Sequence, residues 1–416
     1  MNVNLRSGVR MALAALVTLP LVAADGAASA SPVRTTPAAA AAFAQLEPSH
    51  RPVVNNNYIA VFRDRAVSRQ RVRAVVRALV QRHRGLVAAR IYQNALRGFQ
   101  FRASPELARR LNADHRIQFV QQDYVVTEMG YVVTGQQNRP PAWGLDRIDQ
   151  RALPLNSRYV FPNNGSGVNA YVIDSGIRAS HREFGGRATA AVDFTPDADN
   201  RDCNGHGTHV AGTIGGTNVG VAKGVRLVGL KVLGCNGQGS TSGILSALDW
   251  VVRHGQRPAV VNMSLGHSGA DPALDRAIQK AIQTGFSVVV AAGNDAGNAC
   301  SVSPAQAELA ITVGATNNRD SRDTRYSNYG ACVNIFAPGT DIYSAWPSAN
   351  DSYQTMSGTS MASPMTAGAV ALILGRHANY SPQSVASCLT HISTQNVVAN
   401  AGSGSPNRML FVGQLC

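Results

Sequence analysis

Residues 170–176 of this 416-residue chain are Ala170-Tyr171-Val172-Ile173-Asp174-Ser175-Gly176. Four apolar residues in a row, followed by an acid, a serine and a glycine, are typical of a strand that is buried on both faces of a parallel sheet. Such sheets place their reactive groups at the carboxyl ends of the strands. The sequence therefore predicts that the Asp174 carboxylate emerges at a strand end.

Similar short apolar runs recur in the C-terminal two thirds of the chain, each bounded by Gly, Asn or Ser. They are Leu227–Val232, Ala259–Met263, Ser287–Ala291 and Ala310–Val313. Between them, Ser242–Arg253 and Pro272–Thr284 carry apolar residues at helical spacing. This alternation predicts an α/β fold for residues 136–416, with a mostly parallel sheet and helices on both faces.

Residues 54–135 show a different order of elements. Strand-like segments at Tyr58–Phe62, Leu86–Tyr92, Gly98–Arg102 and Ile117–Val126 alternate with two helical segments, around residues 72–80 and 107–111. The order βαββαβ predicts a small α+β domain of the ferredoxin-like kind. This part of the sequence contains no cysteine and no cluster of candidate catalytic residues, so we expect no chemistry of its own.

The first 53 residues have the composition of targeting and linker segments. Residues 1–30 combine Arg6 and Arg10, an apolar run and the small residues Ala28-Ser29-Ala30, which is the order of a secretory signal peptide. We expect cleavage after Ala30 and a secreted, extracellular protein. Residues 31–53 are rich in Ala and Pro and are interpreted as a linker. Since Thr18 and Pro20 interrupt the longest apolar run, we expect no membrane span.

The formal net charge of +14 would ordinarily suggest a nucleic-acid partner. However, residues 31–135 contain 16 arginines and six acidic residues, so most of the excess charge lies in that segment. If it is removed on maturation, the charge says little about the working protein. We expect a monomer without nucleic-acid or membrane partners.

All six cysteines follow residue 200, in a chain with an export signal, which favours disulfides. Six cysteines allow 15 pairings, and the sequence alone does not choose among them. Gaps of 32, 32 and 28 residues favour three local loops, Cys203–Cys235, Cys300–Cys332 and Cys388–Cys416. Zinc is disfavoured because no C-x2-C or clustered His spacing is present.

Three segments hold the residue types that acyl transfer requires: Asp174, His206 and Ser360. His206 lies in Asn204-Gly205-His206-Gly207-Thr208-His209 and Ser360 in Ser357-Gly358-Thr359-Ser360-Met361-Ala362. Taken alone, each has a structural explanation, such as a turn or helix cap for the aspartate and the serine. Together they meet the needs of a serine nucleophile, which are an imidazole base and a carboxylate that orients it.

Asn294 adds a fourth candidate, because Ala291-Ala292-Gly293-Asn294 ends a predicted strand with an amide donor. Such a donor can stabilise the oxyanion of a tetrahedral intermediate. The structural alternative is an ordinary turn residue.

These segments resemble the three active-site blocks of the subtilisin-like serine proteases, in their chain order Asp, His, Ser. Trp143-Gly144-Leu145-Asp146-Arg147-Ile148-Asp149 and Ser327-Asn328-Tyr329-Gly330 are similar to the proteinase K branch, in particular to its secreted bacterial members. The resemblance covers roughly residues 136–416. Residues 54–129 resemble the propeptide that inhibits these enzymes and helps them fold.

The resemblance implies that Asp174 orients the base, His206 is the general base, Ser360 is the nucleophile and Asn294 is an oxyanion donor. It also implies that a polypeptide substrate is added as a strand between Gly237-Gln238-Gly239 and Ser264-Leu265-Gly266. Small residues at Ala291, Ala292 and Gly293 imply a preference for large apolar or aromatic residues before the scissile bond. We expect a broad-specificity endopeptidase that removes its own propeptide near Thr134–Gln136.

No cofactor is expected in the chemistry itself, but the resemblance implies structural calcium. Oxygen ligands recur in two candidate clusters, Asp146, Asp149 and Gln150, and Asp197, Asp199 and Asp202. At a third family site the aligned residue is Asn334, with the carbonyl groups of Glu308 and Ala310. We expect weak binding there, because an Asn carries no charge.

Two other functions remain alternatives. An inactive scaffold of the same fold is disfavoured because every catalytic position is filled. An esterase of the α/β-hydrolase type would need G-x-S-x-G, and Gly358-Thr359-Ser360-Met361-Ala362 lacks the second glycine. The carboxyl-peptidase relatives of this fold have a Glu in the role of the base, and they are disfavoured because this chain has His206 there.

Overall fold

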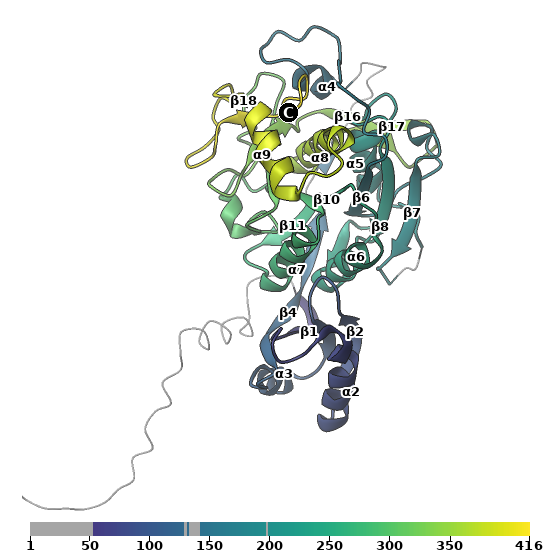
Figure 1. Ribbon diagram of the computed structural model, residues 1–416, viewed down its shortest axis with the longest axis vertical. Helices are drawn as coiled ribbons and strands as arrows, with labels where there is room; N and C mark the ends of the chain where they lie inside the picture. Colours follow the sequence, from purple (N-terminus) through teal and green to yellow (C-terminus); the bar gives the residue numbers. More distant parts are fainter. Residues whose placement is uncertain (1–52, 129–130, 133–141, 197–198) are drawn as a thin grey trace, which may run out of the picture.

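The computed structural model describes residues 53–128, 131–132, 142–196 and 199–416. A small N-terminal domain lies below a larger C-terminal domain in the view of Figure 1. The predicted signal peptide, almost all of the predicted linker and the predicted maturation point at Thr134–Gln136 lie outside the described residues.

The N-terminal domain has the predicted order βαββαβ. Its antiparallel sheet runs in the order β4-β1-β3-β2. One face is covered by two helices, whose apolar residues Val72, Val76, Leu79, Leu107 and Leu111 are buried against the sheet. The elements are β1 (Val53–Phe62), the 3-10 turn η1 (Arg69–Arg71), α2 (Val72–Arg82), β2 (Val87–Tyr92), β3 (Gly98–Arg102), α3 (Pro105–Asn112) and β4 (Ile117–Glu128).

The C-terminal domain is built on one large sheet, in the order β18-β19-β15-β14-β12-β10-β6-β8-β7. All neighbours in it are parallel except β18 and β19. Its strands are β6 (Asn169–Asp174), β7 (Ala188–Asp193), β8 (Arg226–Lys231), β10 (Ala259–Met263), β12 (Ser287–Ala291), β14 (Ile311–Thr316), β15 (Ile335–Pro338), β18 (Thr394–Gln395) and β19 (Arg408–Met409).

Helices cover both faces of this sheet, which confirms the predicted α/β class. Successive side chains of a strand point to opposite faces, and in β6 Val172 joins one core cluster while Tyr171 and Ile173 join the other. The first cluster packs against α5 (His206–Gly215), α8 (Thr359–Arg376) and α9 (Pro382–Ile392), and the second against α6 (Thr241–His254) and α7 (Pro272–Gln283). Figure 1 shows α6 and α7 beside the N-terminal domain.

The remaining elements are short. They are β5 (Tyr131–Val132), α4 (Trp143–Ile148), η2 (Arg182–Phe184), β9 (Gln238–Ser240), β11 (Leu265–Ser268), η3 (Ala299–Ser301), β13 (Val302–Ser303), β16 (Ile342–Trp346) and β17 (Ser352–Ser357). No described helix is both long enough and apolar enough to cross a membrane.

Capping residues in the sequence fix where several helices begin. The Ser240 side chain accepts a hydrogen bond from Gly243 N in α6, and the Asp271 side chain accepts one from Leu274 N in α7. In contrast, α5 and α8 begin after Gly205 and Gly358, which have no side chain that could cap a helix. These two helices carry His206 and Ser360.

Three disulfides join Cys203 to Cys235, Cys300 to Cys332 and Cys388 to Cys416. This is the local pairing that the sequence spacing favoured. Each bond closes a loop of about 30 residues, which stabilises the folded state by limiting the freedom of the unfolded chain.

Candidate active site

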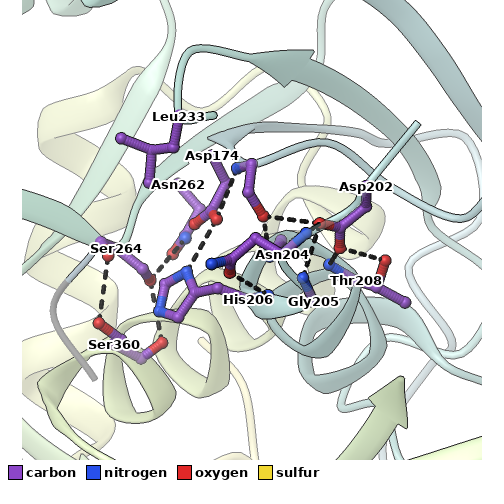
Figure 2. Close-up of polar contacts among 12 residues, drawn as sticks. Asp174, Asp202, Asn204, Gly205, His206, Thr208, Leu233, Asn262, Ser264 and Ser360 are labelled. Carbon is purple, nitrogen blue, oxygen red and sulfur yellow. Dashed lines mark hydrogen bonds and ion pairs between the residues drawn. The ribbon is translucent and has the colours of Figure 1, made fainter. Parts of the chain in front are cut away.

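Asp174 and His206 form a buried pair at the carboxyl end of β6. Asp174 Oδ1 accepts a hydrogen bond from His206 Nδ1 at 2.8 Å and another from Ser175 N at 2.7 Å. Both side chains are fully buried. Figure 2 shows the imidazole between Asp174 and Ser360. The carboxylate therefore fixes the orientation of the ring through Nδ1, so that Nε2 is the nitrogen that can act as a base.

Gly205 allows His206 to stand as the first residue of α5. Its φ of 112° is in the range that favours glycine, and a Cβ there would lie 2.3 Å from the ring of Trp346. Any other residue would strain the backbone directly before His206.

His209, one turn further along α5, has a structural role. Its Nε2 lies 3.0 Å from the Ile342 carbonyl oxygen and 3.1 Å from that of Gln354. Burial and, to a lesser extent, the neighbouring His206 lower the pKa of His209 to about 3, against the opposing effect of the Ile342 and Gln354 hydrogen bonds. The ring is therefore neutral and joins α5 to the β16–β17 hairpin.

Ser360 is the second residue of α8 and is fully buried in this structure. Its hydroxyl donates to the Ser264 carbonyl oxygen at 3.1 Å, and the Ser264 hydroxyl donates to the Ser360 carbonyl oxygen at 2.9 Å. This reciprocal contact joins the start of α8 to the residue that precedes β11. The free N–H groups of a first helical turn favour a negative charge beside Ser360.

Asn294 is oriented by Thr359, the residue before Ser360. Asn294 Oδ1 accepts from Thr359 N and from Thr359 Oγ1, both at 2.9 Å. Since the amide oxygen is held by two donors, the Nδ2 group is the end of the side chain that remains to donate to a ligand. Thr359 Oγ1 in turn accepts from Gly293 N at 3.1 Å.

The two segments predicted to bind substrate lie on either side of β4. Val126 pairs with Gly239 and Thr127 with Gln238 in β9, while Thr127 and Glu128 pair with Gly266 and Leu265 in β11. All these pairings are antiparallel. The C-terminal end of β4 therefore lies between β9 and β11, at the position expected for a substrate strand.

The next described segment, β5, pairs with the strand that leads to Ser360. In β5, Tyr131 pairs with Ser357 and Val132 with Met356 of β17. Residues 129–130, which join β4 to β5, lie outside the described residues. The described residues before and after them pair with β11, which follows Ser264, and with β17, which ends three residues before Ser360.

Comparison with known proteins gives the family. The model of the subtilase family matches residues 165–409, more than half of the chain. The chain belongs to the subtilase family. This confirms the resemblance inferred from the sequence and the expected class of enzyme, a serine-type hydrolase.

Two relatives and one solved structure match most of this subtilase chain. An extracellular serine proteinase of Thermus sp. (strain Rt41A) is 50% identical over 331 residues, which are 79% of each chain. Alkaline serine exoprotease A of Vibrio alginolyticus is 43% identical over 366 residues, 86% of this chain and 67% of its own. The crystal structure of a cold-adapted subtilisin-like serine proteinase has a TM-score of 0.63 and 49% identity, covering 66% of this chain and 99% of that one.

The first candidate calcium cluster of the subtilase retains unused oxygens. Among the described residues, the buried atoms Asp149 Oδ1 and Gln150 Oε1 have no hydrogen-bond partner. Asp146 accepts from Asn156 N and Ser157 N. Calcium binds through such oxygens, so this donor set fits an ion, and the site stays a prediction.

The second cluster fits an ion poorly. Asp199 is bound to the Arg201 guanidinium, and both oxygens of the Asp202 carboxylate accept hydrogen bonds from the protein. Asp197 lies outside the described residues.

At the third predicted site, Asn334 Oδ1 accepts from Thr312 N at 2.7 Å. Asn334, Glu308 and Ala310 line a cavity of about 1270 Å³, away from the catalytic cluster. Within the described part of the chain, no three His, Cys, Asp or Glu residues form a group that could hold a metal.

Sequence reasoning missed several features that shape this site. Thr359 holds the Asn294 amide and lies directly before Ser360, so adjacency was its only signal. Ser264 was predicted as a substrate-binding residue, but the hydrogen bond that its carbonyl oxygen accepts from the Ser360 hydroxyl was not predicted. The β16–β17 hairpin was not predicted, although it supports His209 and pairs with β5.

Proposed function

We propose that this subtilase is a secreted, extracellular serine endopeptidase that acts through an acyl-enzyme on Ser360. The observation that carries the proposal is the buried Asp174–His206 pair, whose imidazole lies between Asp174 and Ser360. The extracellular location is supported by the predicted signal peptide and by the name of the Thermus relative.

In the proposed reaction, the Ser360 oxygen attacks the carbonyl carbon of the scissile peptide bond while His206 Nε2 takes the hydroxyl proton. Asp174 stabilises the imidazolium that forms. The imidazolium then gives the proton to the leaving amine, and water repeats the sequence to release the acid. The groups named supply all of the proton transfers.

The tetrahedral oxygen needs donors in place before the reaction begins. We propose Asn294 Nδ2 and the backbone N–H of Ser360 for this role. The two hydrogen bonds from Thr359 to Asn294 Oδ1 support it, because they leave the amide group of Asn294 as the free end.

We propose that the N-terminal domain is an intramolecular inhibitor and a folding aid. Its β4 fills the groove between β9 and β11. It also binds the first turns of both neighbouring helices: Asp123 accepts from Ser242 N of α6 at 2.9 Å, and Gln121 accepts from Ala273 N of α7 at 3.0 Å. Contacts with two helices favour both inhibition and the correct assembly of the sheet face.

We propose that the first self-cleavage falls between Glu128 and Tyr131, earlier than the maturation point expected from the sequence. The pairings of Glu128 with Leu265 and of Tyr131 with Ser357 support this position, because Leu265 follows Ser264, which binds the Ser360 hydroxyl, and Ser357 lies three residues before Ser360. The new N-terminus near Thr134–Gln136 would then require later trimming.

For the residue before the scissile bond we keep the proposed preference for large apolar or aromatic side chains. Ala291, Ala292 and Gly293 are small, and they precede the proposed oxyanion donor Asn294. Met129, a large apolar residue, lies within the proposed cleavage segment.

The test is Ser360→Ala in the full chain, expressed in a host without proteases. The variant should accumulate as uncut precursor and fail to hydrolyse casein, whereas wild type should mature and be blocked by a serine-directed inhibitor. N-terminal sequencing of early wild-type intermediates should give Met129, Gly130 or Tyr131. A Ser360→Ala precursor that still matures to the wild-type size would refute self-cleavage.

A further inference from the structure

Asp202 lies four residues before His206, and its buried carboxylate has no role in the reaction described above. Oδ1 accepts hydrogen bonds from Ser175 Oγ at 2.9 Å, Gly205 N at 2.8 Å and Asn204 N at 3.2 Å. Oδ2 accepts from both the backbone N–H, at 2.8 Å, and the hydroxyl of Thr208. Figure 2 shows this network next to the Asp174–His206 pair.

The two hydroxyl groups in the network have a defined polarity. Ser175 Oγ accepts from Gly207 N at 2.9 Å, and Thr208 Oγ1 accepts from Arg178 N at 3.0 Å. Each hydroxyl therefore donates its own proton in a hydrogen bond to the Asp202 carboxylate. All five groups bound to Asp202 are donors, which is the pattern of an ionised carboxylate and not of a carboxylic acid.

The network replaces a cap that α5 lacks. Gly205 offers no side chain to the first turn of the helix, and Asp202 binds the N–H groups of Gly205 and Thr208 instead. A carboxylate at a helix N-terminus is also favoured by the helix dipole. The backbone on both sides of His206 is thereby fixed by one group.

The same carboxylate reaches the other half of the catalytic pair. Through Ser175 Oγ it holds the residue that directly follows Asp174. The buried Lys231 holds Ser175 from the opposite side, since its Nζ donates to the Ser175 carbonyl oxygen at 3.0 Å and to that of Leu233 at 2.8 Å. Ser175 is thus fixed between a buried anion and a buried cation.

We propose that Asp202 is a positioning residue for the Asp174–His206 pair, joining the start of α5 to the end of β6 through Ser175. The proposal rests on the proposed function, in which this pair activates Ser360. Without the Asp202 hydrogen bonds, the His206 imidazole and the Asp174 carboxylate can move relative to Ser360. Misplacement of catalytic groups by about 1 Å can cost roughly 100-fold in rate.

The experiment compares kcat and KM on a peptide substrate for Asp202→Asn, Ser175→Ala, Thr208→Val and Thr208→Ser. Incompletely matured samples are processed with an immobilised protease that is then removed. Active-site titration with an acylating reagent normalises kcat to the number of competent sites. The matched control is Asp199→Ala, which removes an exposed carboxylate from the same loop that is bound only to Arg201 among the described contacts.

We expect Asp202→Asn and Ser175→Ala to lower kcat roughly 10- to 100-fold with KM within about twofold, because the substrate strands are untouched. Thr208→Val, which lacks the hydroxyl bound to Asp202, should have a reduced kcat. Thr208→Ser, which keeps the hydroxyl, should have a kcat close to that of wild type. Asp199→Ala should match wild type. The proposal is overturned if Asp202→Asn keeps wild-type kcat, if its loss is confined to KM, or if Asp199→Ala loses as much. Ser360→Ala is run in parallel, and activity in that variant would contradict the proposed function instead.

Discussion

Asp123 of the N-terminal domain accepts a hydrogen bond from the backbone N–H of Ser242, in the first turn of α6, at 2.9 Å. The carboxyl is almost fully buried in the contact between the domains. Burial, with a smaller contribution from Asp271 of the C-terminal domain, raises its pKa from an ordinary 3.8 to about 6. The Ser242 hydrogen bonds and Arg90 act in the opposite direction.

This raised pKa predicts a pH-dependent contact. A carboxyl whose pKa rises on docking favours the docked state at low pH, and this stabilisation disappears as pH rises from about 4 to about 6. The difference amounts to about 3 kcal/mol at most, since one pKa unit corresponds to about 1.4 kcal/mol. In the uncut Ser360→Ala precursor, Asp123→Asn should therefore increase stability at pH 7 and flatten its dependence on pH.

Denaturant unfolding of both precursors between pH 4 and 7 measures this difference. Asp114→Asn is the control, because Arg116 holds the pKa of Asp114 down at about 2, below the range tested. Parallel stability curves for Asp123→Asn and its parent would contradict the prediction.

Asn294→Ala should retain the fold and lower kcat with little effect on KM, because it removes one donor to the tetrahedral oxygen. Loss of the corresponding donor in subtilisin costs roughly 100- to 1,000-fold in kcat, a magnitude carried over from that enzyme. Thr359→Ser, which keeps the hydroxyl bound to Asn294 Oδ1, is the matched control and should remain active. Steady-state kinetics measure both effects. An unchanged kcat in Asn294→Ala would rule out Asn294 as a donor to the tetrahedral oxygen.

Two of the three disulfides, Cys203–Cys235 and Cys388–Cys416, should differ in their effect on activity. Replacing either Cys203 and Cys235 or Cys388 and Cys416 by serine should cost about 3 to 4 kcal/mol of stability, from the length of the loops closed. Only the first pair should also lower kcat/KM, because Cys203 follows Asp202 and Cys235 lies just before the substrate strand β9. Melting curves and kinetics below the melting range separate the two effects. Equal activity losses in the two double variants would show that no such difference exists.

Calcium should stabilise the protein through Asp149. A chelator should lower the melting temperature of wild type. Asp149→Asn should reduce this shift, because bound calcium stabilises the native state in proportion to its affinity for the site, and the substitution weakens that affinity. Asp199→Ala should respond to the chelator as wild type does, since Asp199 is held by Arg201. Melting curves over graded calcium give the comparison, and an undiminished shift in Asp149→Asn would place the ion elsewhere.

The sequence predicted the fold well because its strands are short apolar runs with clear ends. It did less well where a strand is polar. β4 continues past the predicted Val126 to Glu128, because its last residues pair with β9 and β11. β1 likewise begins at Val53, five residues before the predicted Tyr58, across the polar residues Asn55, Asn56 and Asn57.

The candidate site was predictable in its principal residues and not in its supports. Asp174, His206 and Ser360 stand in distinctive local contexts, so their residue types and neighbours carried the signal. The Asp202–Ser175 contact joins residues 27 positions apart. Such a contact is set by how a loop packs against a strand end, and no local period or spacing records it. For this reason Asp202 was interpreted from its charge, as a possible ion ligand.

Strand β4 belongs to the sheet of the N-terminal domain and at the same time fills the groove of the C-terminal domain. With the self-cleavage proposed above, the enzyme's first substrate is encoded in its own gene. Directed evolution of the groove toward a new peptide then also changes the fit to residues 125–132. A library screened for altered specificity will lose variants that cut the new peptide well but cannot cleave off their own N-terminal domain. The junction at residues 125–132 and the groove therefore have to be redesigned together.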